Sequence, residues 1–539
     1  MNALNTYFVS VFTKPKGIIA QDSSYIQYVN DTKYKFDAQK VRICLLTLNT
    51  SKATGPDEIN NKVLKHNSYI LAPNLTALFQ MSLDKGEVPD DWKDAHVTPI
   101  HKSGRTDMAT NYRPISLTSC ICKVMERFIY DWLYDYLTVH SPLNSSQHGF
   151  QHSQSCTTQL IEYLNDVTMS IDRRQCVDVI YLDFSKAFDK ISHSLLITKL
   201  IRRNVPRQLI AWIASFLSNR RQLVVLGATL SDWAPVTSGV PQGSVLGPLL
   251  FNIFVDDLDN VLHRDVKIKK FADDTKLYIK YNADALTQAA LKLQESLNAV
   301  QTWCNQWSMQ LNVSKCTSMF FGCNNPHVTY MLNGSALTNA STMRDLGVTV
   351  SDNACVSQQC LAVSSKARRL TGLMLRTFSS RRRTVILPML KAIIRPIVEY
   401  ATPTWNPCLK KDIAEVEHVQ RKVTKCIRGI SHLSYDERLR SLDLPKLETR
   451  RLYFDMLECF KIVHNLTRSE CQSVISLSEL RTRGYHCRLK SVLPPARTEI
   501  RKHFFLERAL SQWNALPVEV VQQQTYSSFK LSLRKHLSV

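Results

Sequence analysis

Nearly continuous apolar runs and stretches with helical spacing alternate along this chain of 539 residues. Residues 177–182 are almost entirely apolar and predict a buried strand. Tyr, Phe and Ile residues flank the pair Asp273-Asp274 and predict two short strands joined by a turn. Residues 122–137 and 284–307 instead place apolar side chains on one helical face, which predicts two helices that pack in the core. The chain therefore mixes strands and helices.

Asp273 and Asp274 lie at the tip of the predicted hairpin. Two adjacent carboxylates repel each other unless a cation lies between them, so the pair favours a site for Mg²⁺ held by oxygen ligands. A solvated Asp-Asp turn is the alternative. Asp183 favours the metal site, because the apolar strand at 177–182 delivers this third acid at its end.

Residues 238–250 form a Gly-rich loop that opens an apolar helix, where backbone N–H groups can approach a polyphosphate. A strand that ends in an acid, such a loop and an acidic hairpin are, in this order, what two-metal nucleotidyl transfer requires. The pair Asp256-Asp257 has no strand before it and continues from the apolar helix. We interpret this second pair as the polar end of that helix, and expect its substitution to leave activity intact.

Together these blocks resemble the reverse transcriptase region of LINE-type, non-LTR retrotransposons. Further matching segments are residues 91–102, 111–117, 147–150 and 345–348. Each is weak alone, but their order and spacing are specific, and the resemblance covers most of the chain. It implies an α+β right-hand polymerase that extends a DNA 3′-OH primer on an RNA template.

The resemblance also implies a division of the chain. The expected parts are an N-terminal extension at 1–40, fingers at 41–174, a palm with an antiparallel sheet at 175–350, a helical thumb at 351–430, and a mostly helical C-terminal region at 431–539. The reverse transcriptase domain as a whole is expected at about 90–350. We also expect a strand at 95–100 and a turn between two helices at 54–57.

Metal ligands and catalytic residues follow from the resemblance. Asp183 and Asp273 would ligate two Mg²⁺ ions, with Mn²⁺ as a substitute, and Asp274 would assist as a weaker ligand. The backbone carbonyl of Phe184 is expected as an additional ligand. Lys315 matches a basic residue that protonates the departing pyrophosphate, and a surface lysine without such a role is the alternative.

A second set of residues is expected around the incoming dNTP. Lys102 and Arg113 match positions that hold the triphosphate, where an ammonium and a fork-shaped guanidinium suit phosphate oxygens. Gln242 and Gly243 would lie beside the nascent base pair. Phe188 matches the aromatic residue that excludes ribonucleotides by its size.

Two other functions share parts of this pattern. Asp189 follows Asp183 at a spacing that also resembles RNA-dependent RNA polymerases, but Phe188 and the Ala-Asp-Asp block favour a reverse transcriptase. The other alternative is a catalytically inactive or domesticated retroelement protein that only binds nucleic acid. The intact acids, together with Gln242 and Arg113, argue against that decay.

Charge agrees with a nucleic-acid partner. Lys and Arg number 68 against 46 Asp and Glu, so the formal charge is +22, which attracts a polyanion. A basic protein without such a partner is the alternative. The basic residues expected to grip the duplex from the thumb are Arg368, Arg369, Arg381, Arg382 and Arg383. A solvated cationic face is the alternative for this cluster.

Cysteine usage favours a reduced, intracellular compartment, because the 15 cysteines are odd in number and include no CxxC pair. We expect no signal peptide and no membrane partner, and a ribonucleoprotein in cytoplasm and nucleus. Towards the C-terminus, the spacing fits no tight zinc pattern, and we expect ordinary cysteines rather than a zinc site among Cys459, His464, Cys471, His486 and Cys487.

The expected partners are the RNA template, the DNA primer, target DNA and dNTPs. Residues 1–40 are too few for the endonuclease that LINE-type elements place upstream, and the C-terminal region has no acid and zinc cluster of the restriction type. We therefore expect no endonuclease domain in this chain.

Overall fold

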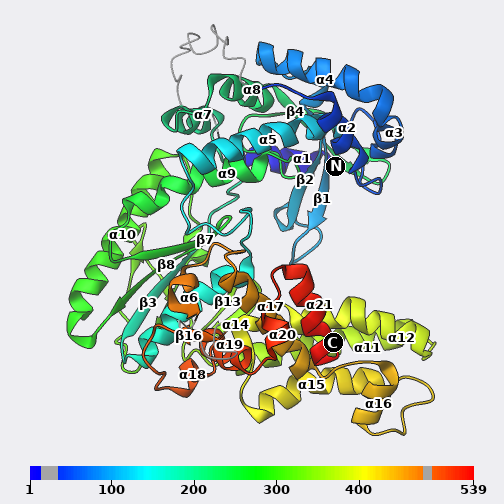
Figure 1. Ribbon diagram of the computed structural model, residues 1–539. Helices are drawn as coiled ribbons and strands as arrows, with labels where there is room; N and C mark the ends of the chain where they lie inside the picture. The colour runs from blue at the N-terminus through cyan, green and yellow to red at the C-terminus, as the bar shows by residue number, and fades with distance from the viewer. Residues whose placement is uncertain (14–33, 478–487) are drawn as a thin grey trace. The chain divides into compact units, whose positions relative to one another are not determined.

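The computed structural model describes residues 1–13, 34–477 and 488–539 (Figure 1). These residues form two compact units, each assembled from segments that are separate in the sequence. The first unit comprises Met1–Phe150, Asp183–Leu262 and Ser296–Asn312, and the second comprises Gln151–Leu182, His263–Glu295 and Val313–Val539. Mixed helices and sheets agree with the expected α+β class. The expected boundaries of fingers, palm and thumb differ from those of the units and stay predictions.

The first unit contains a mixed sheet with the order β2-β1-β4-β5, in which β6 also pairs with β4. Strand β1 is antiparallel to β2 and parallel to β4, and it confirms the strand predicted at 95–100. The strands are β1 (Asp94–His101), β2 (Tyr112–Leu117), β4 (Arg220–Leu226), β5 (Thr229–Leu230) and β6 (Ala234–Val236).

Helices surround this sheet in the first unit. The longest complete one, α5, begins after Ser119, whose side chain accepts a hydrogen bond from the Cys122 amide, and it confirms the helix predicted at 122–137. The turn predicted at 54–57 lies between α2 and α3. The helices are α1 (Asn2–Ser10), α2 (Ala38–Leu46), α3 (Asn61–His66), α4 (Ser68–Lys85), α5 (Cys120–His140), α7 (His193–Arg202), α8 (Arg207–Leu217) and α9 (Gly247–Val255).

The second unit is built on a sheet with the order β12-β9-β3-β8-β7, antiparallel except between β12 and β9. Every residue of β3 is buried, which confirms the buried strand predicted at 177–182. The strands are β3 (Cys176–Leu182), β7 (Lys267–Phe271), β8 (Asp274–Tyr281), β9 (Thr317–Phe321) and β12 (Thr338–Asn339). Three further antiparallel pairs are β10 (Met331–Leu332) with β11 (Ser335–Ala336), β13 (Thr342–Asp345) with β14 (Val348–Ser351), and β15 (Ile475–Leu477) with β16 (Leu489–Ser491).

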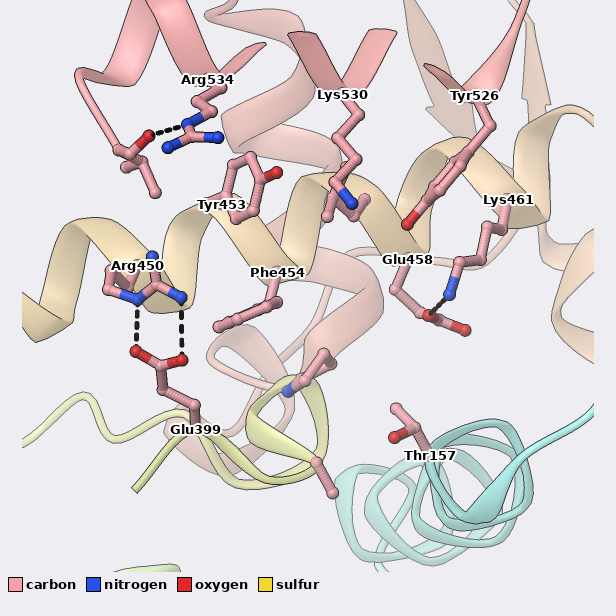
Figure 2. A pocket seen from close by; sticks show the side chains of 14 residues that line it. Thr157, Glu399, Arg450, Tyr453, Phe454, Glu458, Lys461, Tyr526, Lys530 and Arg534 are labelled. Carbon is pink, nitrogen blue, oxygen red and sulfur yellow. Dashed lines mark hydrogen bonds and ion pairs between the residues drawn. The ribbon is translucent and has the colours of Figure 1, made fainter. Parts of the chain in front are cut away.

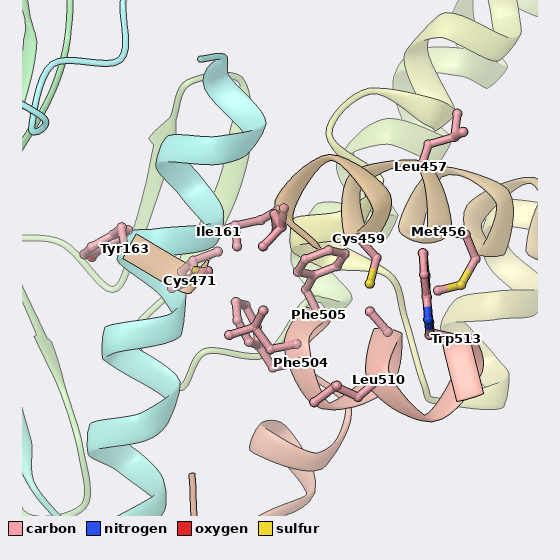
Figure 3. Close-up of a cluster of buried hydrophobic side chains, with 14 of the residues drawn as sticks. Ile161, Tyr163, Met456, Leu457, Cys459, Cys471, Phe504, Phe505, Leu510 and Trp513 are labelled. Atoms are coloured by element: carbon pink, nitrogen blue, oxygen red, sulfur yellow. The ribbon is translucent and has the colours of Figure 1, made fainter. Parts of the chain in front are cut away.

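One face of this sheet and the C-terminal helices share a single hydrophobic core (Figure 3). Val177, Val179 and Tyr181 alternate along β3, so they lie on one face and pack with helix α6 (Cys156–Asp172). Helices α17 (Leu447–Val463), α19 (Phe505–Asn514) and α21 (Tyr526–Leu537) contribute Phe460, Phe505 and Phe529 to the same cluster. The C-terminal region is therefore part of the body that supports the sheet.

A second cluster of buried side chains lies among the helices that follow the sheet. These helices and the remaining short ones are α11 (Ser357–Thr377), α12 (Arg383–Met389), α13 (Arg395–Glu399), α14 (Thr402–Trp405), α15 (Lys410–Lys425), α16 (Tyr435–Leu442), α18 (Glu499–Lys502) and α20 (Val518–Val521). Helix α10 (Leu286–Gln306), predicted at 284–307, contributes residues to both units. In the described part of the chain, no helix is both long and apolar enough to cross a bilayer.

Candidate active site

The acidic hairpin is a tight turn between β7 and β8. Phe271 pairs with Asp274, so only Ala272 and Asp273 form the turn, as expected for a two-residue hairpin. Ala272 adopts a φ of 55°, a conformation that residues with a Cβ rarely take and that is found preferentially at functional sites. Asp273 is half-buried and Asp274 is exposed.

Strand register brings the end of β3 to the same sheet edge as this turn. Leu182, the last residue of β3, pairs with Thr275, the second residue of β8. Asp183 follows Leu182 directly and is half-buried, so chain connectivity starts it at that edge. The end of β3 and the turn between β7 and β8 therefore lie at the same edge of the sheet.

The three acids fit Mg²⁺ by their chemistry, because carboxylate oxygens are the hard ligands that this ion prefers. Among the described residues, no group of three or more His, Cys, Asp and Glu side chains is close enough to hold a metal ion. The metal set of Asp183, Asp273 and Asp274 therefore stays a prediction that rests on the strand register.

Phe184 and Lys315 flank this edge in the sequence. Phe184 is buried and pairs with Leu311 in an isolated bridge, in which the Asn312 amide donates to the Asp183 carbonyl (2.8 Å). The Phe184 carbonyl takes no part in that hydrogen bond, which fits its expected role as an additional metal ligand. Lys315 is exposed in a 3₁₀ turn before β9.

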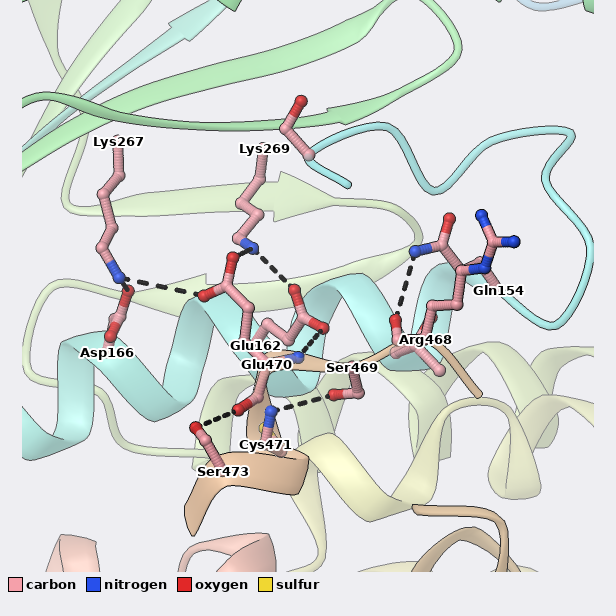
Figure 4. A network of polar contacts seen from close by, with 12 residues as sticks. Gln154, Glu162, Asp166, Lys267, Lys269, Arg468, Ser469, Glu470, Cys471 and Ser473 are labelled. Atoms are coloured by element: carbon pink, nitrogen blue, oxygen red, sulfur yellow. Dashed lines mark hydrogen bonds and ion pairs between the residues drawn. The ribbon is translucent and has the colours of Figure 1, made fainter. Parts of the chain in front are cut away.

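Buried ion pairs hold β7 and β8 against neighbouring elements of the second unit, and Figure 4 shows those of β7. The Lys269 ammonium on β7 binds Glu162 of α6 at 2.6 Å and Glu470 at 2.7 Å. Burial alone would lower the pKa of Lys269, but the two carboxylates outweigh it and raise the pKa. Lys276 on β8 pairs with Asp345. The strands on both sides of the turn are thus fixed by charges.

Hydrogen bonds to Ser116 and Asp189 hold the Gly-rich loop in place within the first unit. The Gln242 carbonyl accepts the Ser116 amide (2.8 Å), and the Gln242 side-chain amide donates to Asp189 (2.8 Å). Gly243 has a φ of 128°, and an added Cβ would lie 2.5 Å from the Ser116 carbonyl oxygen. Gly239 has a φ of 85°, and its added Cβ would lie 2.8 Å from Asp189 backbone atoms. Both glycines are therefore required by the fold.

Glu126 supports this loop, and it was not identified from the sequence. It is fully buried on α5, and its carboxylate accepts hydrogen bonds from the amides of Val245 (2.7 Å) and Leu246 (3.1 Å), just before α9. Burial raises its pKa, and the two amides oppose that shift. The signal was present, because Glu126 lies four residues after Cys122 and three before Ile129 on the buried face.

Phe188, the predicted gate against ribonucleotides, packs against two aromatic rings in the first unit. Its half-buried ring stacks on Phe251, with centroids 4.3 Å apart and planes at 7°, and meets the edge of Phe150 at 6.1 Å. The next residue, Asp189, is buried, and burial raises its pKa despite the hydrogen bond from Gln242. Asp189 thus binds the loop in this structure, and the gate role of Phe188 stays a prediction.

The predicted triphosphate ligands lie on the β1–β2 hairpin. Arg113 pairs with Ile100 across the two strands, and Lys102 follows the last residue of β1. The Lys102 amide donates to the Asn111 carbonyl (2.8 Å), which closes the loop between the strands. Both side chains are exposed, as phosphate ligands at a loop must be.

The second Asp-Asp pair confirms the interpretation as a helix end, since α9 ends at Val255 and a 3₁₀ helix (Asp256–Val261) follows. Asp256 is buried, pairs with Arg203 and accepts the Asn144 amide (2.7 Å). Substitution of this aspartate is therefore expected to cost stability, and the expectation that it leaves activity intact stays a prediction.

Asp257 holds a buried lysine. The Lys199 ammonium donates to Asp257 (2.6 Å) and lies 3.8 Å from the centroid of the Trp307 ring. The Trp303 indole also donates to Asp257 (2.9 Å). Burial lowers the pKa of Lys199 to about 8, although Asp257 opposes the shift.

The five predicted thumb arginines have different surroundings. Arg368 pairs with Glu415 (2.5 Å), and Arg383 donates to the Ser441 carbonyl (3.0 Å). Arg381 donates to carbonyls at the C-terminal end of α11, including that of Leu375 (2.6 Å). These three side chains stabilise the helices whatever else they bind. The remaining two, Arg369 and Arg382, are exposed.

The C-terminal cysteines agree with the expectation of ordinary buried side chains. Cys459 and Cys471 belong to the hydrophobic core shared with the sheet, and burial raises the pKa of both thiols. The His464 ring stacks on Phe460 with centroids 4.0 Å apart. His486 and Cys487 lie outside the described residues.

Comparison with known proteins gives this site its context. Residues 100–350 match the family model of reverse transcriptase (RNA-dependent DNA polymerase). The chain is 27% identical over 463 residues to the RNA-directed DNA polymerase from mobile element jockey of Drosophila melanogaster, which covers 83% of this chain and 50% of that protein. It is 28% identical over 395 residues to the probable RNA-directed DNA polymerase from transposon BS of the same organism, covering 71% and 43%.

A more distant relative is the Pol polyprotein from type-1 retrotransposable element R2 of Popillia japonica, 25% identical over 252 residues, with 44% of this chain and 34% of that protein covered. The chain spans about half the length, or less, of these relatives. All three belong to mobile elements.

Proposed function

We propose that this chain, in which residues 100–350 belong to the reverse transcriptase family, is an RNA-directed DNA polymerase of a non-LTR retrotransposon. It extends a DNA 3′-OH primer on an RNA template with dNTPs. The main support is the register of β3 with β8, which pairs Leu182, the residue before Asp183, with Thr275, the residue after the Asp273-Asp274 pair, within the matched region.

The acids hold two Mg²⁺ ions in this proposal, and Mn²⁺ can replace them. Bound ions would supply an activated 3′-oxygen and charge neutralisation on the leaving pyrophosphate. Asp183 and Asp273 would hold the ions through their carboxylate oxygens, Asp274 would be a weaker ligand, and the Phe184 carbonyl would add one more oxygen. The strained Ala272 and the buried Lys269 fix the turn, so that the carboxylates need little reorganisation.

Exposed cations orient the incoming nucleotide. Lys102 and Arg113 bind the triphosphate, because both are exposed at one end of the β1–β2 hairpin. Gln242 and Gly243 face the nascent base pair from a loop latched to Ser116. Lys315 gives a proton to the pyrophosphate oxygen as it leaves, which its exposure permits.

Sugar selection rests on Phe188. Phe251 covers one face of its ring, so the ring cannot turn away easily from a 2′-OH that meets its free edge. A buried hydroxyl without a partner costs about 1–3 kcal/mol, so ribonucleotides are disfavoured at least tenfold.

The division into a right hand follows from the same homology. The mixed sheet of the first unit and its helices are assigned to fingers, the sheet around β3 to the palm, and helices α11 to α15 to the thumb. Thumb arginines bind duplex phosphates, and Arg369 and Arg382 are the best candidates since both are exposed. The protein acts inside the cell, where its RNA and DNA partners are.

Primer extension on poly(rA)/oligo(dT) with dTTP or UTP tests the proposal. We expect Mg²⁺-dependent extension with dTTP and at least tenfold lower kcat/KM with UTP. In Phe188→Val the ratio should move towards UTP. Preference for UTP in the unmodified protein would establish the RNA polymerase alternative instead. Tight binding of primer–template without any extension would establish the inactive, nucleic-acid-binding alternative.

A further inference from the structure

Helices α17 and α21 lie side by side in the second unit, and their apolar faces fix each other. The Phe529 ring of α21 stacks on Phe460 of α17, with centroids 4.3 Å apart, and lies 5.5 Å from Trp513. Phe529 and Leu533 are fully buried. The remaining faces of the two helices are therefore held at a fixed separation, with a groove between them (Figure 2).

Helical spacing directs one set of side chains from each helix into this groove. Tyr526, Lys530 and Arg534 are spaced by four residues on α21, so they lie on one face. Arg450 and Phe454 have the same spacing on α17. Figure 2 shows these side chains converging on the space between the helices.

The groove is large enough for more than one ligand group. The part around Tyr526 has a volume of about 530 Å³, and a neighbouring part has about 710 Å³. The two parts share Glu399, Arg450 and Arg534, so they are continuous. The second part adds the cations Lys391, Arg395 and Lys535.

Positive charge exceeds negative charge in the groove, whose acidic side chains are Glu399, Glu458 and Asp443. Glu399 pairs with Arg450 (2.8 Å), and Glu458 pairs with Lys461 (3.0 Å). Three further lysines line the groove, Lys391, Lys530 and Lys535. Within the described ranges, none of them makes an ion pair. Arg534 donates to the Val539 carbonyl (2.5 Å), and its positive charge lies one turn from that of Lys530, so an anion near both would relieve their repulsion.

Aromatic rings lie beside these cations. The Arg450 guanidinium is 5.3 Å from the centroid of the Phe454 ring, and the Lys461 ammonium is 5.7 Å from that of Tyr526. Both rings are half-buried, so part of each is open to the groove. Cations that follow a phosphate backbone, together with rings on which bases stack, are the combination that binds single-stranded nucleic acid.

We propose that this groove binds single-stranded nucleic acid, with phosphates at Lys530, Arg534 and Lys535 and bases against Phe454 and Tyr526. A duplex would keep its bases stacked internally and leave the rings unused. An acidic peptide would engage the cations but not stack on the rings. The groove goes beyond the proposed polymerase activity, because none of its residues belongs to the metal set, the dNTP set or the predicted thumb arginines.

Fluorescence anisotropy with a labelled single-stranded RNA tests this assignment. The full chain is titrated in EDTA, without dNTPs, and with excess unlabelled hairpin primer–template to occupy the polymerase site. We expect the double substitution Lys530→Gln with Arg534→Gln to weaken binding at least tenfold. The slope of log K against log salt should become shallower by about 0.7 for each phosphate that the variant no longer neutralises. Tyr526→Ala should weaken binding about five- to a hundredfold.

The matched control replaces two cations of α15 that are equally exposed but outside the groove, Lys422→Gln with Lys425→Gln. It should leave affinity and salt slope unchanged. For variants that fold poorly, photocrosslinking of 4-thiouridine RNA to the unmodified protein replaces the titration, and crosslinks should map to α17 and α21.

Three results would overturn the assignment: unchanged affinity and slope in the groove variants, crosslinks confined to other elements, or competition by polyglutamate as strong as by single-stranded RNA. The last result would identify an acidic protein partner instead. Because the assay needs neither metal nor dNTP, a protein that fails to extend a primer can still bind here. Failure of the groove and failure of the polymerase proposal are therefore distinguishable.

Discussion

Two of the three Asp-Asp pairs in the chain, at 256–257 and 273–274, have opposite surroundings. Asp256 and Asp257 lie in a 3₁₀ helix after α9, where Asp256 is 4% exposed. Asp273 and Asp274 lie at a hairpin turn, where the first is half-buried and the second exposed. The same dipeptide can therefore hold a fold together or be presented to a ligand, depending on the element that contains it.

Cations of the first unit hold Asp256 and Asp257 in place. Arg203 and Lys199 are supplied to the first pair by helix α7 and the residue that follows it, and this internal pairing offsets the cost of burying two acids. Beside the hairpin, the buried Lys269 pairs with Glu162 and Glu470. The protein thus stabilises the strands beside the turn with charges, and leaves the carboxylates at its tip at the surface.

The largest effect should come from Asp273→Asn, which removes a charge and keeps the shape. If Asp273 bridges two ions, single-turnover incorporation of dTMP should fall at least a hundredfold, because positioning and charge neutralisation supply nearly all catalysis in phosphoryl transfer. The melting temperature should stay within about 2 °C, since surface substitutions rarely change stability much. A rate within threefold of the unmodified protein would remove Asp273 from the metal site.

Asp256→Ala should mainly affect stability. The change leaves Arg203 in a mostly buried site without its carboxylate and removes the acceptor of the Asn144 amide, so we expect a loss of about 3–5 kcal/mol in the free energy of unfolding. Urea denaturation measures it. Asp91→Ala is the control, because Asp91 is an exposed acid of the same unit. Equal midpoints for the two variants would contradict the anchoring role.

Asp257→Ala should cost less, about 1–3 kcal/mol. Lys199 loses its carboxylate but keeps the Phe254 carbonyl and the surrounding rings. Asp257 is also more exposed than Asp256, with 34% of its side chain accessible against 5%. The same denaturation experiment ranks the two, and a larger loss for Asp257→Ala would reverse the order proposed here.

The smallest effect is a pH dependence from Lys199. Its pKa is lowered by burial from 10.5 to about 8, so between these values the unfolded chain holds a proton that the folded chain has lost. Stability should therefore rise with pH in this window, by up to about 1.4 kcal/mol per pH unit, relative to Lys199→Met. Below pH 8 the difference between the two proteins should be flat. A difference that falls as pH rises would contradict the lowered pKa.

Local patterns in the sequence predicted the elements of the site well. The strand before Asp183, the turn at Asp273 and the helix opened by the Gly-rich loop are each determined by neighbouring residues, and all three are confirmed. Short hairpins such as β13–β14 were missed, because strands of a few residues show too little alternation to be recognised.

Contacts between distant residues were beyond such patterns. Lys269 meets Glu470 across 201 positions of the chain, and nothing in the local sequence of either residue indicates the other. Predicting the burial of Glu126 would have required the position of the loop at 245–246, which is known only from the fold. The core that α17 and α21 share with the sheet could not be predicted for the same reason, since helical periodicity predicts a buried face but not the element that covers it.

Iron-directed cleavage of the chain tests the central claim most directly, because it locates a divalent ion without relying on activity. Fe²⁺ is a divalent ion that carboxylates also bind, and with ascorbate and peroxide it releases hydroxyl radicals that cut nearby backbone. We predict cuts near Asp183 and near 273–274 that Mg²⁺ suppresses and that Asp273→Asn abolishes. Cuts near 256–257 instead, or cuts that persist unchanged in Asp273→Asn, would contradict the account.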